Sequence, residues 1–207
     1  IPDFGSTKSS PANAAFYEDS IWYFSDDALL YQLRLDYDGR NKCVTSSRQK
    51  FVPPKPPNTV ELIKYDIKNY TKRGFGDIAI DVTNGVLYGA QAGGYFFSVD
   101  LDEVLAAADE NRKKTKSAVQ GKVQVDKAYK DLGILKVENP KTGKKEAVSL
   151  QLSFNPDYTI LYAQTFGNET GGGEDFAGAF YTIDKFASGT PVTDFTGYQT
   201  GAVNDDV

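Results

Sequence analysis

The chain has 207 residues, a formal net charge of -5, 40% hydrophobic residues and 25% charged residues. This composition is typical of one globular domain, or of two small ones, and it excludes a disordered chain. No apolar run of about 18 residues occurs, so the sequence contains no candidate membrane span. The absence of His and the single Cys exclude Ser-His-Asp catalysis, His-dependent metal sites and an internal disulfide.

The first of three similar segments covers about residues 12–65. Because short runs rich in apolar and aromatic residues favour β-structure, we expect three strands, over Ala14–Tyr17, Ser20–Phe24 and Leu30–Asp36. The candidate for a fourth, outer strand is Thr59–Tyr65. The Pro-rich run before it must be extended, and we interpret it as a stiff connection; a ligand for an aromatic groove is the alternative.

A polar turn follows the third of these strands. Asp36, Asp38 and Asn41 place oxygen ligands around Gly39, as calcium-binding loops do, although the spacing is not that of an EF-hand. Ca²⁺ bound by these three residues is therefore the one candidate cofactor, and a solvated turn is the alternative. Neither a phosphate-binding loop nor a dinucleotide motif occurs, so no other cofactor is expected.

The second segment, about residues 74–137, has the clearest pattern. Asn84-Gly85 is a strong hairpin signal because both turn positions need positive φ. With a second turn at Gly93-Gly94, it separates three expected strands, Ile78–Asp81, Val86–Ala90 and Tyr95–Asp100. The outer strand is expected over either Val119–Val125 or Leu132–Val137.

The only helical pattern covers Asp102–Lys114. Asp100 or Asp102 can cap this helix at its N-terminus, and Val104 and Ala108 belong to its one apolar stripe. We interpret it as a short surface helix that leads into a basic insertion over residues 110–146.

Basic residues are concentrated in one part of the chain. Residues 112–145 contain eleven basic and three acidic residues, a balance of 11 - 3 = +8, which leaves -5 - 8 = -13 for the rest. Such asymmetry favours contact with a protein partner or with an acidic face of a second copy, whereas a solvated Lys-rich insertion is the alternative. Nucleic acid is not an expected partner, because the whole chain is acidic and aromatic residues do not alternate with the lysines.

The third segment, about residues 147–207, repeats the strand and turn pattern. Asn155-Pro156-Asp157 is its first turn. The expected strands around it are Leu150–Phe154, Thr159–Ala163 and Ala179–Asp184, with an outer strand at Val192–Phe195. Across the three segments, a tyrosine lies in each middle strand (Tyr23, Tyr88, Tyr162), and an aspartate ends each third strand (Asp36, Asp100, Asp184).

Three such meanders predict an all-β fold in which the copies pack face to face, with one short surface helix. The segment from Ile78 to Leu101 resembles a blade of the YWTD, NHL and gluconolactonase-like β-propellers, although Leu87–Ala90 stands where the YWTD tetrapeptide would be. The resemblance implies a β-propeller-like single domain with three recognisable units, either a partial propeller or a piece of a longer one. A sandwich of the same meanders is the alternative. Open sheet edges would then offer further surface to partners.

An enzymatic interpretation rests on few residues. Asp77, Asp81 and Asn155 are the only reasonable donors for a metal-dependent hydrolase or lyase of the propeller type. The alternative is that Asp81 and Asn155 start turns, where their side chains accept hydrogen bonds from backbone N–H groups. No catalytic residue is assigned.

Two sequons, at Asn69 and Asn168, are candidate N-glycosylation sites. With a chain that contains no Met and begins at Ile1, they favour a secreted or cell-surface protein whose signal peptide has been removed. We therefore expect a non-enzymatic extracellular binding or assembly module. A metal-dependent hydrolase and a structural subunit of an extracellular filament or layer are the alternatives.

Overall fold

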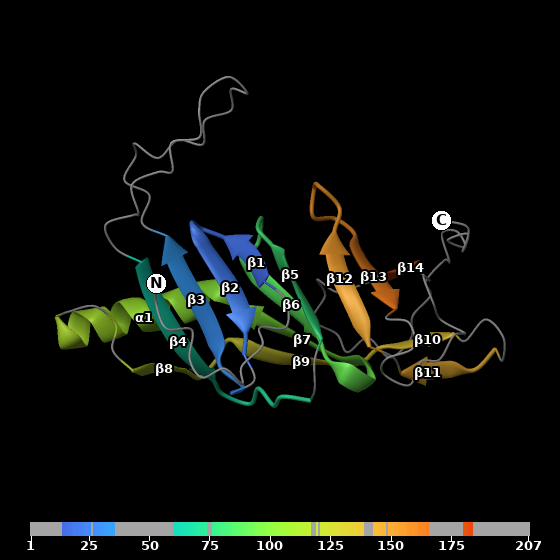
Figure 1. Ribbon diagram of the computed structural model, residues 1–207, viewed down its shortest axis with the longest axis horizontal. Helices are drawn as coiled ribbons and strands as arrows, with labels where there is room; N and C mark the ends of the chain where they lie inside the picture. The colour runs from blue at the N-terminus through green and yellow to red at the C-terminus, as the bar shows by residue number, and fades with distance from the viewer. Residues whose placement is uncertain are drawn as a thin grey trace, which may run out of the picture.

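Figure 1 shows the protein as a computed structural model. The structure describes residues 14–25, 27–35, 60–73, 76–116, 119, 121–138, 143–147, 149–165 and 180–183. These residues form a mostly β fold with one α-helix, as the sequence predicts. Within them, no helix is long and apolar enough to cross a membrane.

The first sheet begins with an antiparallel meander. It consists of β1 (Ala14–Tyr17), β2 (Ser20–Phe24), β3 (Leu30–Leu35) and β4 (Val60–Ile67), in that order. All four strands were expected. A fifth strand, β8 (Lys122–Val125), joins β4 in parallel and was predicted as an outer strand of the second segment instead.

The second sheet has the order β5 (Asp77–Asp81), β6 (Val86–Ala90), β7 (Tyr95–Asp100) and β9 (Tyr129–Ile134), all antiparallel. Both predicted turns are present, and the short 3₁₀ helix η1 (Ala92–Gly94) contains two glycines with positive φ. At the first turn only Gly85 has positive φ (65°), and Asn84 does not, because the loop between the paired residues Asp81 and Val86 has four residues instead of two. The outer strand, β9, overlaps the second of its two predicted ranges.

The predicted helix is α1 (Leu101–Thr115), directly after β7. The Asp100 carboxylate caps it by accepting hydrogen bonds from the backbone N–H groups of Asp102 and Glu103, at 3.0 and 3.2 Å. Leu101, Val104 and Ala108 are fully buried, so one face of the helix packs on the sheets.

The third sheet consists of β12 (Leu150–Phe154), β13 (Leu161–Thr165) and β14 (Phe180–Ile183), again antiparallel. Its predicted outer strand, residues 192–195, lies outside the described residues. A separate two-stranded sheet pairs β10 (Lys136–Glu138) with β11 (Lys145–Ala147).

The basic segment is not a simple insertion, contrary to the prediction. Its described residues include the end of α1 and the strands β8 and β9, which extend two different sheets. The reason is the alternating pattern of β8, in which Val123 and Val125 are buried while Lys122 and Gln124 are exposed. The described lysines of this segment are all exposed, and several of them lie on α1, β8 and β9.

The three larger sheets stack in chain order. One hydrophobic core joins the first sheet to the second sheet and α1, and a second core joins the second sheet to the third. The first strands of neighbouring sheets contact each other, β1 with β5 and β5 with β12 (Figure 1). The described sheets form an open stack and do not close into a barrel or a propeller.

Two of the three aligned tyrosines, Tyr88 and Tyr162, occupy equivalent faces of their sheets. Tyr88 points away from the first sheet into the core between the second and third sheets, and Tyr162 points away from the second sheet, because its neighbours Leu161 and Ala163 face that sheet. Tyr23 differs, because it lies with Leu29 and Tyr31 on the face of the first sheet that is turned away from the second. Trp22 or Phe24 therefore corresponds to Tyr88, one residue away from the predicted alignment.

Candidate binding sites

Four predicted site residues lie outside the described residues: Asp36, Asp38, Asn41 and Asn168. The calcium loop and the second sequon therefore stay predictions. Among the residues that the structure does describe, no group of three or more His, Cys, Asp or Glu side chains could hold a metal ion.

The candidate hydrolase donors form hydrogen bonds with the backbone. Asp81 accepts from the N–H groups of Thr83 and Asn84 through Oδ1, and Asn155 Oδ1 accepts from Ile160 N–H at 2.7 Å. These are the turn roles that the sequence offered as the alternative. Asp77 is buried and accepts from the N–H groups of Ile78 and Leu152 through its two oxygens, at 2.7 and 2.8 Å. The three side chains thus hold turns and sheets in place.

Asn69, the first predicted glycosylation site, is exposed in the turn after β4 and has φ 70°. The N–H of Tyr70 donates to the Ile67 carbonyl at 3.1 Å, which closes this turn. The Asn69 amide is therefore on the surface, where a glycan can be attached.

One end of the sheet stack carries exposed hydrophobic side chains. Phe16 is 55% exposed, and Val82 and Ile160 are each 38% exposed. Phe16 is the last but one residue of β1, Val82 directly follows β5, and Ile160 directly precedes β13, so each lies close to the turn between the first and second strands of its own sheet. We call these three residues the hydrophobic turn set. A large apolar side chain is thus exposed near the same turn of all three meanders, although at a different position in each.

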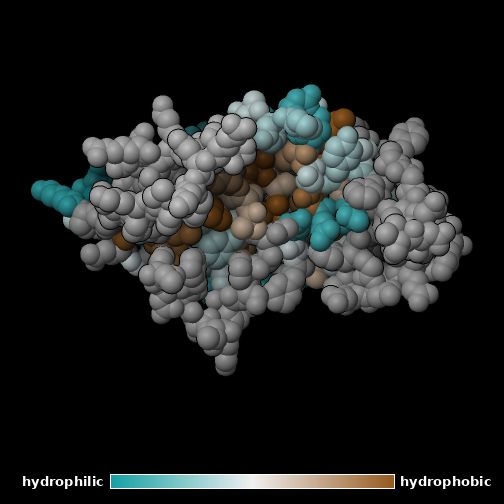
Figure 2. All heavy atoms as spheres, turned by 45° about the horizontal axis from the view of Figure 1, so that its top comes forward, coloured by the Kyte–Doolittle hydropathy of each residue, from teal (hydrophilic) through white to brown (hydrophobic). Residues whose placement is uncertain are grey.

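The turns of the first two sheets lie beside each other. A Cβ atom on Gly85, in the second sheet's turn, would be only 2.9 Å from the hydroxyl oxygen of Tyr17, at the end of β1. Figure 2 turns this end of the stack toward the viewer and shows hydrophobic residues gathered near the middle of the face, with hydrophilic residues beside them. This end therefore offers an apolar surface.

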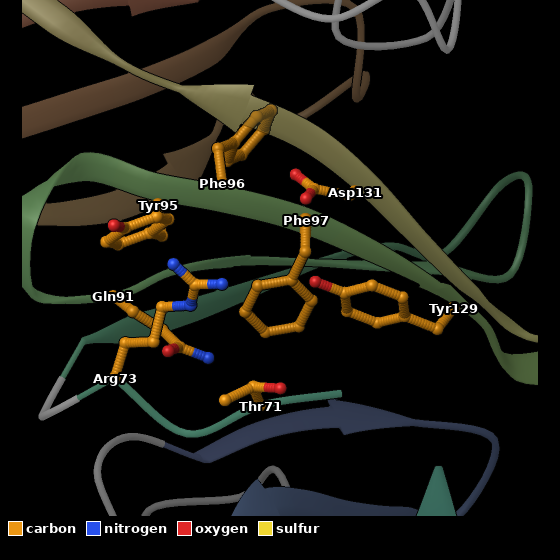
Figure 3. A pocket seen from close by; sticks show the side chains of 8 residues that line it. All are labelled: Thr71, Arg73, Gln91, Tyr95, Phe96, Phe97, Tyr129 and Asp131. Atoms are coloured by element: carbon orange, nitrogen blue, oxygen red, sulfur yellow. The ribbon is translucent and has the colours of Figure 1, made fainter. Parts of the chain in front are cut away.

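A polar cleft lies on the second sheet, toward the opposite end of β7 (Figure 3). The cleft is shallow: the empty space of about 230 Å³ at this place includes open solvent, and the enclosed part has room for about one water molecule. Its walls come from the β4–β5 connection, the β6–β7 turn, β7 and β9, and its lining residues are Thr71, Arg73, Gln91, Tyr95, Phe96, Phe97, Tyr129 and Asp131.

Arg73 stacks on an aromatic ring at the edge of the cleft. Its Cζ atom is 3.9 Å from the centre of the Tyr95 ring. No carboxylate among the described residues forms an ion pair with Arg73. Stacking fixes the plane of a guanidinium group and leaves its N–H edges available.

Gln91 lies at the bottom of the cleft and is only 5% exposed. Its backbone is fixed by the β6–β7 turn, because its N–H donates to the Tyr95 carbonyl at 2.8 Å and its carbonyl accepts from Gly94 N–H at 3.1 Å. Its side-chain Oε1 is buried and has no hydrogen-bond partner. A buried acceptor without a donor costs free energy, and this oxygen is also shielded from solvent.

Tyr129 and Asp131 complete the cleft from β9. Tyr129 points its hydroxyl toward the middle, and the Asp131 carboxylate enters beside Phe97 (Figure 3). Burial raises the pKa of Tyr129, Asp131 raises this pKa further, and Arg73 lowers it. The hydroxyl thus stays protonated at neutral pH and lies within the field of both charged groups.

No sequence pattern predicted this cleft. Its charged and amide side chains are separated by up to 58 residues, from Arg73 to Asp131, and no motif links them. The only signal was the predicted turn at Gly93-Gly94. Comparison of the chain with protein-family models, with curated proteins and with solved structures found no match.

Proposed function

We propose that this chain is a non-enzymatic binding or assembly module, outside the cell or at its surface, built on a β-propeller-like scaffold. The observation that carries the proposal is the hydrophobic turn set, Phe16, Val82 and Ile160. Single exposed hydrophobic residues are normal on a protein surface. Three of them at corresponding turns of three stacked sheets form a repeated feature, which suits contact with a protein partner.

The scaffold proposal is supported by the stacking of the sheets. Each meander packs its face on the next, and the first strands lie side by side, as propeller blades arrange them around an axis. Turns at the ends of such blades are positioned by a rigid core and are common places for binding residues.

The hydrolase alternative has less support. Asp81 and Asn155 bond the backbone of their own turns, and Asp77 bonds both its own sheet and the next one. A metal ion would have to replace these hydrogen bonds. We therefore propose that the function depends on the exposed surface and not on the side chains of Asp77, Asp81 and Asn155.

Site-specific photocrosslinking tests the proposed contact. A benzophenone amino acid at position 82 or 160 should crosslink a partner, or a second copy, in an extract of the source cells. The same probe at Asp126, an exposed residue outside the hydrophobic turn set, is the matched control. Crosslinks that are equally frequent at all three positions, or absent from positions 82 and 160, would contradict the proposal.

A further inference from the structure

The turn between β5 and β6 contains the one Asn-Gly pair of the chain, Asn84-Gly85. An asparagine before glycine readily loses its side-chain amide, because glycine has no side chain to keep the reacting atoms apart. The backbone nitrogen of Gly85 bonds Asn84 Cγ and gives up its proton, the Cγ–Nδ2 bond breaks, and ammonia leaves with that proton. Water then opens the cyclic imide and leaves aspartate or isoaspartate. Asn84 is exposed, so water reaches this site.

The Asp81 carboxylate holds Asn84 at two points. Asn84 Nδ2 donates to Asp81 Oδ2 at 2.7 Å, and the backbone N–H of Asn84 donates to Asp81 Oδ1 at 3.1 Å. Asp81 itself is only 2% exposed, so its position is fixed. A hydrogen bond from an amide to a carboxylate is charge-assisted, and it adds electron density to the amide. Asn84 Cγ is therefore a weaker electrophile, and its side chain is held in one rotamer.

Gly85, which supplies the attacking nitrogen, is fixed from its other side. Its carbonyl accepts from the N–H of Leu101, the first residue of α1, at 2.9 Å. A Cβ atom on Gly85 would be 2.9 Å from the hydroxyl oxygen of Tyr17, so this part of the turn is closely packed. The attack requires Gly85 N and Asn84 Cγ to approach each other in one particular alignment, which needs rotation of the peptide between them. The fold restricts that rotation.

We propose that Asn84 is a deamidation site and that Asp81 slows its reaction in the folded chain. The aspartate product would face the Asp81 carboxylate with a second negative charge in place of a donor, so the turn would lose this hydrogen bond. Val82 belongs to the same four-residue loop. The chemistry does not depend on the hydrophobic turn set, so either proposal can fail alone.

The test follows the loss of the amide by mass spectrometry of peptides from the whole chain, after incubation in mildly alkaline buffer. The protein is incubated folded and, in parallel, unfolded in guanidinium chloride. Asn84 should react at least about tenfold more slowly in the folded protein. Asn155 is the internal control, because the residue after it is Pro156, which has no backbone N–H to attack with. It should stay intact in both samples.

Two variants isolate the contribution of Asp81. Asp81→Ala removes both acceptors, and in the folded state Asn84 should then react about tenfold faster than in the unmodified protein. Asp81→Asn has nearly the same shape and keeps one oxygen acceptor but loses the charge, so it should give a smaller acceleration. Circular dichroism shows whether each variant is folded, and Asp81→Asn serves as the test if Asp81→Ala is not. Asp126→Asn, which changes an exposed carboxylate elsewhere, should leave the rate unchanged.

Three results would overturn the proposal. Equal rates for Asn84 in the folded and the unfolded protein would show that the fold gives no protection. An intact Asn84 in the unfolded chain would show that it is not a deamidation site. An unchanged rate in a folded Asp81 variant would show that the protection does not come from this carboxylate.

Discussion

The Asp77 carboxylate, at the start of β5, accepts a hydrogen bond from the backbone N–H of Leu152 in β12, at 2.8 Å. Its other oxygen accepts from Ile78 N–H within its own sheet. Asp77 is 4% exposed, so one buried side chain joins the first strands of the second and third sheets. Since the Leu152 N–H is on an edge strand, this bond also satisfies a donor that no strand of the third sheet reaches.

Replacement of Asp77 should therefore destabilise the stack. Asp77→Ala leaves two backbone N–H groups without their acceptor, and we expect the free energy of unfolding to fall by about 2–4 kcal/mol. Urea unfolding followed by circular dichroism measures this change. Asp126→Asn, which alters an exposed ion pair with Lys68, is the control and should change stability by less than about 0.5 kcal/mol. Equal effects of the two variants would contradict the role of Asp77.

The connection that carries Arg73 is fixed by a close backbone contact. A Cβ atom on Gly76 would be 1.5 Å from the carbonyl oxygen of Ala90, the last residue of β6. Gly76→Ala should therefore cost more than about 2 kcal/mol of stability and displace Arg73 from Tyr95. Gly121 is the matched control, because it has open space around it and only a positive φ of 73°.

The Gly121→Ala variant should lose about 1 kcal/mol, the usual cost of an alanine at positive φ. Thermal unfolding of both variants distinguishes the two causes. A smaller loss for Gly76→Ala than for Gly121→Ala would show that the connection does not lie against β6.

Alkaline pH should lower the free energy of unfolding, because the buried tyrosines cannot lose their protons readily in the folded protein. Burial raises the pKa of Tyr65 and of Tyr70 above the ordinary value of 10.0, and it raises the pKa of Tyr88 to about 12. Below pH 10.0 these hydroxyls are protonated in both states, so their contribution to stability is complete. Above it, the unfolded chain loses protons first, and stability falls as the pH rises toward the folded pKa.

Urea unfolding at about pH 9 and about pH 11 should therefore differ by at least about 1 kcal/mol, with lower stability at the higher pH. Tyr65→Phe removes one of these groups and should reduce the difference. Tyr65 donates its hydroxyl to Gln32 at 2.6 Å, so the variant must also be compared with the unmodified protein at the lower pH. Identical stability at both pH values would contradict the burial of these hydroxyls.

Glycosylation at Asn69 follows from its sequon and its exposed turn. Expression in a eukaryotic secretory pathway should add a glycan to this residue, seen as a mass increase that enzymatic deglycosylation removes. Asn69→Asp is the suitable variant, because Asp also tolerates the positive φ of 70°. It should remove the glycan at this position and leave the stability nearly unchanged. A glycan-free Asn69 in the secreted protein would contradict the prediction.

The local elements were predictable because their signals are local. The Asn84-Gly85 turn, the Asp100 cap of α1 and the alternation in the strands each depend on residues close in sequence. The place of β8 was not predictable, because its short apolar alternation suits the edge of either sheet and only the packed fold selects β4. The predicted alignment of Tyr23 with Tyr88 was wrong for a related reason. Because side chains alternate between the two faces of a strand, a shift of one residue in the alignment moves a residue to the opposite face.

The two candidate binding sites differ in the same way. Exposed apolar residues next to turns are visible in the sequence, but their common end of the stack is not, because it depends on how the sheets pack. The cleft is lined by Arg73 from the β4–β5 connection, Gln91 from the β6–β7 turn and Asp131 from β9. These residues are far apart in the sequence and line one cleft only in the folded chain.

The photocrosslinking experiment at positions 82 and 160 tests the account most directly. We predict that both positions crosslink a partner or a second copy, and that the control position Asp126 crosslinks far less often. Crosslinks that are equally frequent at all three positions, or absent from positions 82 and 160, would contradict the account.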